Sequence, residues 1–129
     1  SQEMHPKTAT ATAMIQVGIS VSLPEYDPEK AVRWLIDNSD GDAEKRANRL
    51  YLEQYRKSLK ALIMKEQVGK FSIAAREMEA YADQRYLDHL NVMKEAIRLD
   101  EQARFLRHGA EIKLDVWRTA ESTKRTLKV

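Results

Sequence analysis

The chain has 129 residues, of which 43% are hydrophobic and 33% are charged, with a formal net charge of +2. This length fits a single domain, and the charged fraction, above the usual value of about 25%, favours elongated helices with long solvated faces. The absence of cysteine excludes disulfides and thiolate chemistry, and no apolar run approaches the roughly 18 residues that cross a membrane. The N-terminus also lacks a signal-peptide pattern, so these features predict a cytoplasmic protein with no membrane partner.

Residues 1–27 are expected to form an N-terminal arm in front of a helical domain of residues 28–129. Within the arm, apolar residues alternate strictly with other residues from position 15 to position 23, which is the pattern of a β-strand. The apolar positions are Ile15, Val17, Ile19, Val21 and Leu23. Because no second strand of similar quality is present, this strand should pair with another copy of the chain or with another protein. An extended arm that packs on the helices is an equal alternative.

A short helix is expected to begin at Pro28, because Asp27 is a favourable N-cap and proline is favoured at the first helical position. The sequence Asn-Ser-Asp-Gly at residues 38–41 should end this helix. Trp34 belongs to its apolar side. A tryptophan in such a position is more often a core residue than a surface hot spot for a partner, and we expect it in the core.

A second helix is expected over residues 42–68. Gly69 suits the left-handed conformation that ends a helix, and Ser72 can cap the next one. A bend is expected at residues 81–83, where Asp83 can cap the helix that follows.

The longest expected helix covers residues 83–124. Its apolar positions alternate in steps of four and three residues, which is the repeat of a coiled-coil seam. The seam consists of Val92, Ala96, Leu99, Ala103, Leu106, Ala110, Lys113, Trp117 and Ala120. At 1.5 Å per residue this helix would span about 63 Å, whereas residues 42–68 would span only about 40 Å. The long helix outruns its partner within the chain, so part of it should contact another chain or the N-terminal segment.

We therefore expect a homo-oligomer. Its candidate interface combines the alternating segment of the arm with apolar residues on the unpaired half of the long helix. These residues are Ile15, Val17, Ile19, Val21, Phe105, Ile112, Val116 and Trp117.

No pattern of catalytic residues is present. The chain lacks a glycine-rich phosphate loop, a G-x-S-x-G elbow and an H-E-x-x-H motif. His108 and Glu111 have a spacing that two ligands of one metal could use, but no nearby cluster supplies the other ligands. A helical hairpin also offers no deep pocket of the usual enzyme kind. We therefore expect neither an enzyme nor a bound metal or cofactor.

Positive charge collects toward the C-terminus. The candidate DNA-binding residues are Arg104, Arg107, Arg118, Lys124 and Arg125. Clustered positive charge binds phosphate, but acidic residues interrupt this surface and no known DNA-reading motif is present. The simpler interpretation, which we favour for the basic end, is a solvated helix end whose cations suit the negative end of the helix dipole.

Three segments resemble small, mostly uncharacterised helical proteins of tailed phages and prophages, which are typically encoded near early recombination and replication genes. The segments are Tyr51-Leu52-Glu53-Gln54-Tyr55-Arg56-Lys57, Tyr81-Ala82-Asp83-Gln84-Arg85-Tyr86 and Val116-Trp117-Arg118-Thr119. The resemblance covers residues 42–124, and proline often stands in that family where this chain has Gln84. It implies a non-enzymatic helper of phage DNA metabolism in the bacterial cytoplasm, acting on DNA ends, on a recombinase or on a host nuclease.

The sequence thus predicts an all-α fold: an elongated, coiled-coil-like helical hairpin with a short extra helix and one N-terminal β-strand or extended arm. The expected function is that of an accessory protein of phage-type DNA recombination or replication, which binds DNA or a DNA-processing protein as a homo-oligomer. The alternative is an inhibitor or adaptor that binds a host protein, for example a nuclease, without contacting DNA.

Overall fold

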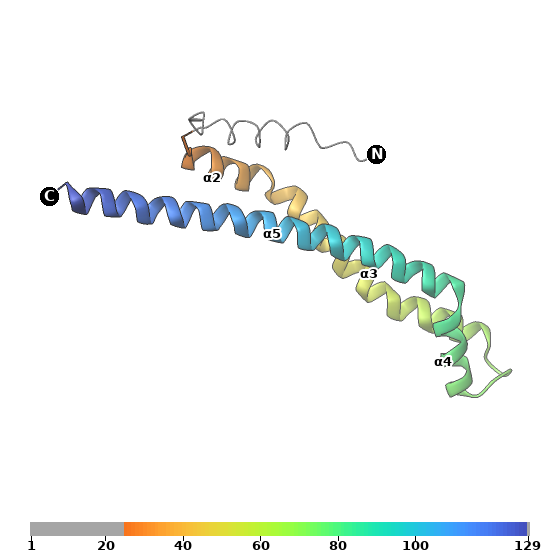
Figure 1. Cartoon of the computed structure of the whole chain (residues 1–129). Coiled ribbons are helices and arrows are strands. Elements are labelled where there is room, and N and C mark those ends of the chain that lie inside the picture. The colour runs from red at the N-terminus through yellow and green to blue at the C-terminus, as the bar shows by residue number, and fades with distance from the viewer. Residues whose placement is uncertain (1–24, 129) are drawn as a thin grey trace, which may run out of the picture.

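The computed structural model describes residues 25–128, which form helices joined by short connections (Figure 1). The helices are α2 (Pro28–Asp37), α3 (Ser39–Glu66), α4 (Ile73–Ala82) and α5 (Gln84–Leu127). The all-α prediction is confirmed for this part of the chain. The expected strand at residues 15–23 and most of the arm assigned to residues 1–27 lie outside the described residues.

The N-terminus of α2 follows the sequence prediction. Asp27 has an extended backbone, and its carboxylate accepts hydrogen bonds from the backbone N–H groups of Glu29 at 3.0 Å and Lys30 at 3.3 Å. Pro28 occupies the first helical position, where its missing N–H costs nothing. The cap therefore fixes where α2 begins.

The predicted stop at residues 38–41 is wrong in its extent, because only Asn38 separates α2 from α3. Asn38 keeps a nearly helical backbone (φ −88°, ψ −5°), and its carbonyl accepts from Asp42 N–H at 2.9 Å, so the helical hydrogen bonds resume at once. Gly41 lies inside the first turn of α3. Asp40 and Asp42 lie in the same turn, where their negative charges interact favourably with the positive end of the helix dipole. The two helices consequently form one bent path.

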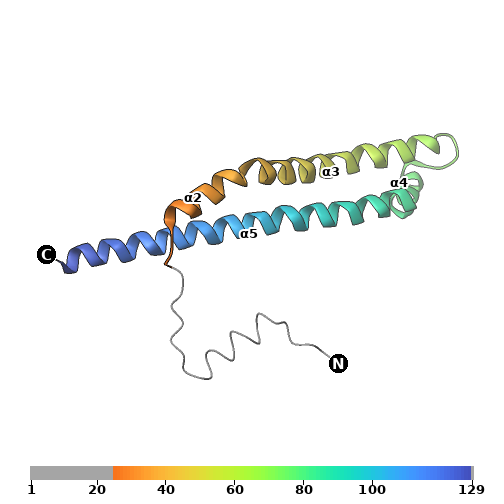
Figure 2. The same cartoon turned by 90° about the horizontal axis from the view of Figure 1, so that it is seen from above.

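This bent path runs antiparallel to α5 (Figures 1 and 2). At 1.5 Å per residue the 44 residues of α5 span about 66 Å, whereas the 28 residues of α3 span about 42 Å. The C-terminal end of α5 projects past the start of α2 (Figure 2). The predicted mismatch in helix length is therefore present, although α2 shortens the unpaired part.

The closed end of the hairpin also forms where local signals predict it. Gly69 has a φ of 87°, the left-handed region that favours glycine, in the connection between α3 and α4. Ser72 Oγ accepts from Ala75 N–H at 3.2 Å and caps α4. Asp83 interrupts the helical backbone (ψ 135°), and its side chain accepts from Arg85 N–H at 2.8 Å to start α5.

The core lies at this closed end, where α3, α4 and α5 meet. Ile63 of α3, Ala80 of α4 and Tyr86 of α5 are buried together. Leu59, Met64 and Leu90 are partly buried against them. Ile63 is the only large side chain of the described residues that is almost fully enclosed. Its burial therefore contributes much of the apolar stabilisation at this end.

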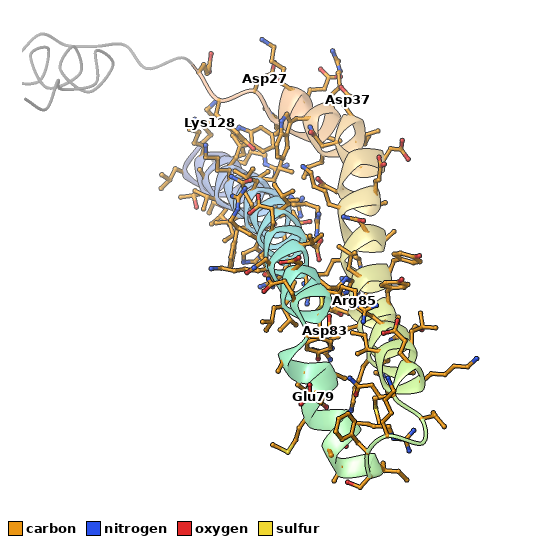
Figure 3. All side chains as sticks on the ribbon, turned by 90° about the vertical axis from the view of Figure 1, so that its right-hand side faces the viewer. Asp27, Asp37, Glu79, Asp83, Arg85 and Lys128 are labelled. Atoms are coloured by element: carbon orange, nitrogen blue, oxygen red, sulfur yellow. The ribbon has the colours of Figure 1, made fainter. Side chains whose placement is uncertain are left out.

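Ion pairs brace the same end from outside. Arg85 donates to both carboxylate oxygens of Glu66, at 2.8 and 2.7 Å, and also contacts the Asp83 carboxylate at 3.0 Å (Figure 3 labels Asp83 and Arg85). Arg85 thus ties the last turn of α3 to the first turn of α5. Lys60 makes a similar bridge from α3 to Glu77 of α4 at 2.8 Å.

Truncation of Ile63 should destabilise the hairpin. We expect Ile63→Ala to lower the free energy of unfolding by about 2–5 kcal/mol, because it leaves a cavity at the most enclosed large side chain of the described residues. Leu62→Ala is the matched control, since Leu62 is 53% exposed against 1% for Ile63, and should cost less than about 1 kcal/mol. Denaturant melts followed by circular dichroism measure both, and similar losses would contradict the assigned core.

Acidification should destabilise the closed end. Hydrogen bonds from Arg85 lower the pKa of Glu66 and of Asp83, and one from Lys60 lowers the pKa of Glu77. Above its unfolded pKa of about 4, each of these carboxylates stabilises the folded state to its full extent. This stabilisation is lost as the pH falls through the lower pKa of the folded state. We expect the Tm to fall between about pH 5 and pH 3, and to fall less in Arg85→Met. An equal fall in both proteins would contradict this.

Candidate interaction surfaces

Only some of the residues in the predicted seam lie on the face of α5 that packs on α3. Ala96 and Ala103 are buried as expected. Val92 and Leu106, however, are 54% and 56% exposed, so their assignment to the packed face is wrong for the described chain. The buried positions that replace the expected ones include Met93 and Asp100. The helix is therefore rotated so that charged residues, rather than leucines, alternate with the alanines.

Ion pairs between the helices explain this rotation. Arg49 of α3 donates through Nη1 to Asp100 Oδ2 and to Glu101 Oε1, both at 3.0 Å. Arg107 Nη1 donates to Asp42 Oδ2 at 2.8 Å. The alanines bring the helix axes close enough for these side chains to meet, since interaxial distance depends on the contacting residues. The hydrogen bonds of Arg49, first to Glu53 and then to Asp100 and Glu101, raise its pKa, which keeps it charged.

The two pairs also fix how the helices are aligned. Asp42 and Arg49 are seven residues apart on α3, and Asp100 and Arg107 are seven apart on α5. On each helix the acidic residue precedes the basic one, and because the helices are antiparallel, both pairs form together only in one alignment. Sliding one helix by seven residues would place Arg49 opposite Arg107 or Asp42 opposite Asp100. Like charges in those positions would be destabilising.

The C-terminal half of α5 carries an exposed apolar face on the side away from α3, which we call the outer face. It contains Phe105, Ile112 and Val116, three of the predicted interface residues, and all are exposed in the described structure. Trp117, the fourth predicted residue on α5, is only partly exposed and lies on a different side of the helix. Ile15, Val17, Ile19 and Val21 lie outside the described residues.

A groove of about 480 Å³ separates α2 from α5 and adjoins the outer face. Tyr26 and Trp34 form one wall, and Phe105, Leu106 and Gly109 lie on the α5 side. The prediction that Trp34 belongs to the core is wrong, because it is 40% exposed. The reason is that α2 is covered by α5 and α3 alone, and no third layer of described chain closes over it.

The structure does not bring the five candidate DNA-binding residues together. Arg107 faces α3 and pairs with Asp42, and Arg104 pairs with Glu101 at 2.8 Å. The remaining three candidates lie on the projecting end of α5: Arg118, Lys124 and Arg125. Arg118 lies 3.8 Å from Asp115, and Lys124 lies 3.4 Å from Glu121.

The apolar surface at the closed end of the hairpin, which we call the tip, is not among the surfaces predicted from the sequence. It is formed by Val68, Phe71, Ile73 and Met78, all of which are exposed. The sequence does contain a pattern that could have indicated this surface, since four large apolar residues lie within eleven positions around a turn. Their exposure was not predicted, because a short amphipathic helix such as α4 is normally expected to bury such residues.

The described residues hold little that indicates catalysis. Within residues 25–128, no three His, Cys, Asp or Glu side chains are grouped so that they could hold a metal ion. His108 Nδ1 is 3.9 Å from Glu111 on the surface. His89 Nε2 is 2.7 Å from the carbonyl of Leu52, which ties the ring to α3. Among the described helices, none has a stretch both long and apolar enough to cross a membrane.

Comparison of the chain with protein-family models, with curated protein sequences and with solved structures gives no match. The resemblance to phage and prophage proteins therefore stays a prediction, and the surfaces described above are the basis for assigning a function.

Exchange of the charges in the Asp42–Arg107 pair should test the alignment of the helices. We expect Asp42→Arg or Arg107→Asp alone to lower the Tm by about 5 °C or more, because each places like charges against each other between the helices. The double variant should recover most of the loss. Arg118→Asp is the control, because its contact with Asp115 is long and exposed, and its Tm should change little. Failure of the double variant to recover stability would contradict the alignment.

Proposed function

We propose that the protein is a non-enzymatic accessory factor of phage-type DNA recombination or replication that acts, as a homo-oligomer, by binding a protein of that process. A recombinase or a host nuclease is the class of partner. The observation that carries the proposal is the distribution of apolar side chains over residues 25–128, where large apolar residues are mostly exposed. Contiguous exposed apolar patches mark surfaces that bind other proteins.

The tip is the surface that best suits a separate protein partner. Val68, Phe71, Ile73 and Met78 are all exposed there, at the opposite end of the molecule from the groove and the basic end (Figure 3 labels Glu79 near the tip and Lys128 at the far end). Large apolar side chains that lose water on binding dominate the energy of protein interfaces. The ion pairs of Arg85 and Lys60 hold α3, α4 and α5 together at this end, and Ile73 and Met78 lie on α4, so this part of the surface is preorganised.

The assignment to phage DNA metabolism rests on the resemblance of residues 51–57, 81–86 and 116–119. Residues 81–86 form the junction between α4 and α5, next to the tip. The version of the proposal in which the partner is a host protein, and no DNA is contacted, uses the same surface.

Direct binding of DNA is a second candidate, and one observation favours it. Residues 113–128 contain five Lys or Arg and two Asp or Glu, and the C-terminal part of this segment projects beyond α2 (Figure 2). The ion pairs there are long and exposed, so a phosphate group could replace the acidic partner at little cost. Against it, Arg104 and Arg107 are held by acidic partners elsewhere, which leaves a small basic area.

Affinity capture with the full chain tests the proposal. We expect the immobilised protein to retain a specific DNA-processing protein from infected or host bacterial lysate. Phe71→Glu with Ile73→Glu should abolish this capture, because the tip would lose its apolar character. Lys70→Glu is the matched control, since it changes charge in the same connection without removing an apolar side chain, and it should still capture the partner.

DNA binding by fluorescence anisotropy separates the two candidates. The protein-binding proposal expects no binding of single- or double-stranded DNA at low salt. Binding that weakens steeply as salt is added, and that disappears in Arg118→Glu with Arg125→Glu, would transfer the function to the basic end. Retention of capture by the Phe71 and Ile73 variant would remove the tip from the proposal.

A further inference from the structure

The chain enters the described structure directly at the groove between α2 and α5. Tyr26, the second described residue, forms part of the groove wall. The segment before residue 25, which lies outside the described residues, is therefore attached at one end of the groove. Because α2 runs antiparallel to α5, this end lies beside Lys113, and Trp34 and Phe105 line the other end (Figure 2).

The walls of the groove suit an apolar occupant. Trp34 is 40% exposed, Phe105 64% and Leu106 56%, so a large apolar surface there faces outward. One acidic and two basic residues make up the charged part of the lining, and the acidic one, Asp27, already caps α2. The lining therefore gives no strong preference for a charged partner, whereas removal of the apolar walls from water is favourable.

The segment attached to the groove has this apolar character. Residues 8–24 contain no charged side chain. Within them, large apolar residues occupy every second position from 15 to 23, and small or polar residues occupy the positions between. An extended backbone places successive side chains on opposite sides. One side of the extended segment would therefore be entirely apolar, and the other side could face water.

The lengths of the groove and of the segment also match. From Phe105 to Lys113, α5 advances about 12 Å along its axis. In an extended segment, Val17 and Val21 are about 13 Å apart and Ile19 lies between them on the same side. These three side chains consequently suffice to cover the groove from one end to the other.

The sequence between the segment and α2 can direct it into the groove. Pro24 suits the second position of a turn over residues 23–26, which would reverse the chain beside Tyr26. Ile19 would then lie opposite Gly109, near the middle of the groove. A side chain added at Gly109 would meet nothing within 4 Å, so the described helices leave this space open.

The covalent connection favours this segment over any separate occupant. A short linker gives an attached group an effective concentration in the millimolar range. A second copy of the chain or another protein would have to compete with a segment that is always present at that concentration.

We propose that residues 17–21 of the same chain fill the groove between α2 and α5 in an extended conformation. Their three apolar side chains lie against the walls, and the segment runs back from the Lys113 end toward Phe105. The inference is independent of the tip and goes beyond the proposed function. It also leaves Ile112 and Val116, rather than the alternating segment, for contacts between copies.

A thiol crosslink within one chain tests the position, since the chain contains no cysteine of its own. A short bismaleimide should join Ile19→Cys to Gly109→Cys at least about tenfold faster than it joins Ile19→Cys to Ser122→Cys. Ser122 is exposed on the projecting end of α5, about 20 Å from Gly109 in the direction away from Phe105. An undocked segment would reach both positions, so Ser122 is the matched control.

The crosslinked product should keep the mass of a single chain at every protein concentration. Equal rates for the two cysteine pairs would show that the segment does not occupy the groove, and would overturn the proposal. A product with the mass of two chains would assign the groove to the segment of a second copy, and would overturn it as well.

Fluorescence of Trp34 supplies a second measurement. In a Trp117→Phe background, Trp34 is the only tryptophan of the chain. Val17→Asp with Ile19→Asp should shift its emission to longer wavelength and increase its quenching by acrylamide. The reason is that the two carboxylates would not enter the apolar groove, which leaves the indole ring in water.

Gln16→Asp with Ser20→Asp is the control, because it places the same charge on the other side of the extended segment. Its Trp34 emission should stay that of the parent protein, and equal shifts in both variants, or no shift in either, would contradict the proposal. Phe71→Glu with Ile73→Glu should likewise leave the Trp34 emission unchanged. Failure of the tip as a binding surface and failure of this inference are therefore seen separately.

Discussion

The alignment of α3 and α5 depends on two ion pairs between the helices, Arg49 with Asp100 and Asp42 with Arg107. Each helix contributes an acidic residue followed seven positions later by a basic one, and the antiparallel packing sets each acidic residue opposite a basic one. Apolar contacts alone would not fix this alignment, because alanine fits against most neighbours in a helical seam. The pairs make neighbouring alignments unfavourable, so they select one hairpin among several of similar apolar burial.

The same arrangement explains why so much apolar surface faces outward. With alanines and ion pairs between the helices, the described part of the hairpin has its one almost fully buried large side chain, Ile63, at its closed end. The leucines and aromatic residues of α5, such as Leu106 and Phe105, are turned away from α3. Within residues 25–128 no third layer covers them. The stability of the hairpin and its interactions are consequently connected, because a partner that covers these faces adds burial that the described helices lack.

Much of the fold could be predicted, whereas the candidate surfaces could be predicted only in part. The exposure of Phe105, Ile112 and Val116 followed from the length mismatch between helices. The groove could not be predicted from the sequence. It depends on α2 leading through Asn38 directly into α3, so that α2 also lies along α5, and the sequence Asn-Ser-Asp-Gly resembles a helix stop. The nearly helical backbone conformation of Asn38 is what makes this point a bend between two helices rather than the end of one. That conformation is selected by the packing of the helices around it.

The sequence by itself determined where α2, α4 and α5 begin and where α3 ends. Asp27, Ser72 and Asp83 cap the residues directly after them, and Gly69 adopts its left-handed conformation in the connection that follows α3, so these signals act over a few residues. Only the tertiary structure decided which side of α5 is inside. The alanines lie between a stripe with leucines and a stripe with charges, and periodicity permits either stripe to join them. The choice was made by contacts between residues 51 and 65 positions apart, which no local pattern records.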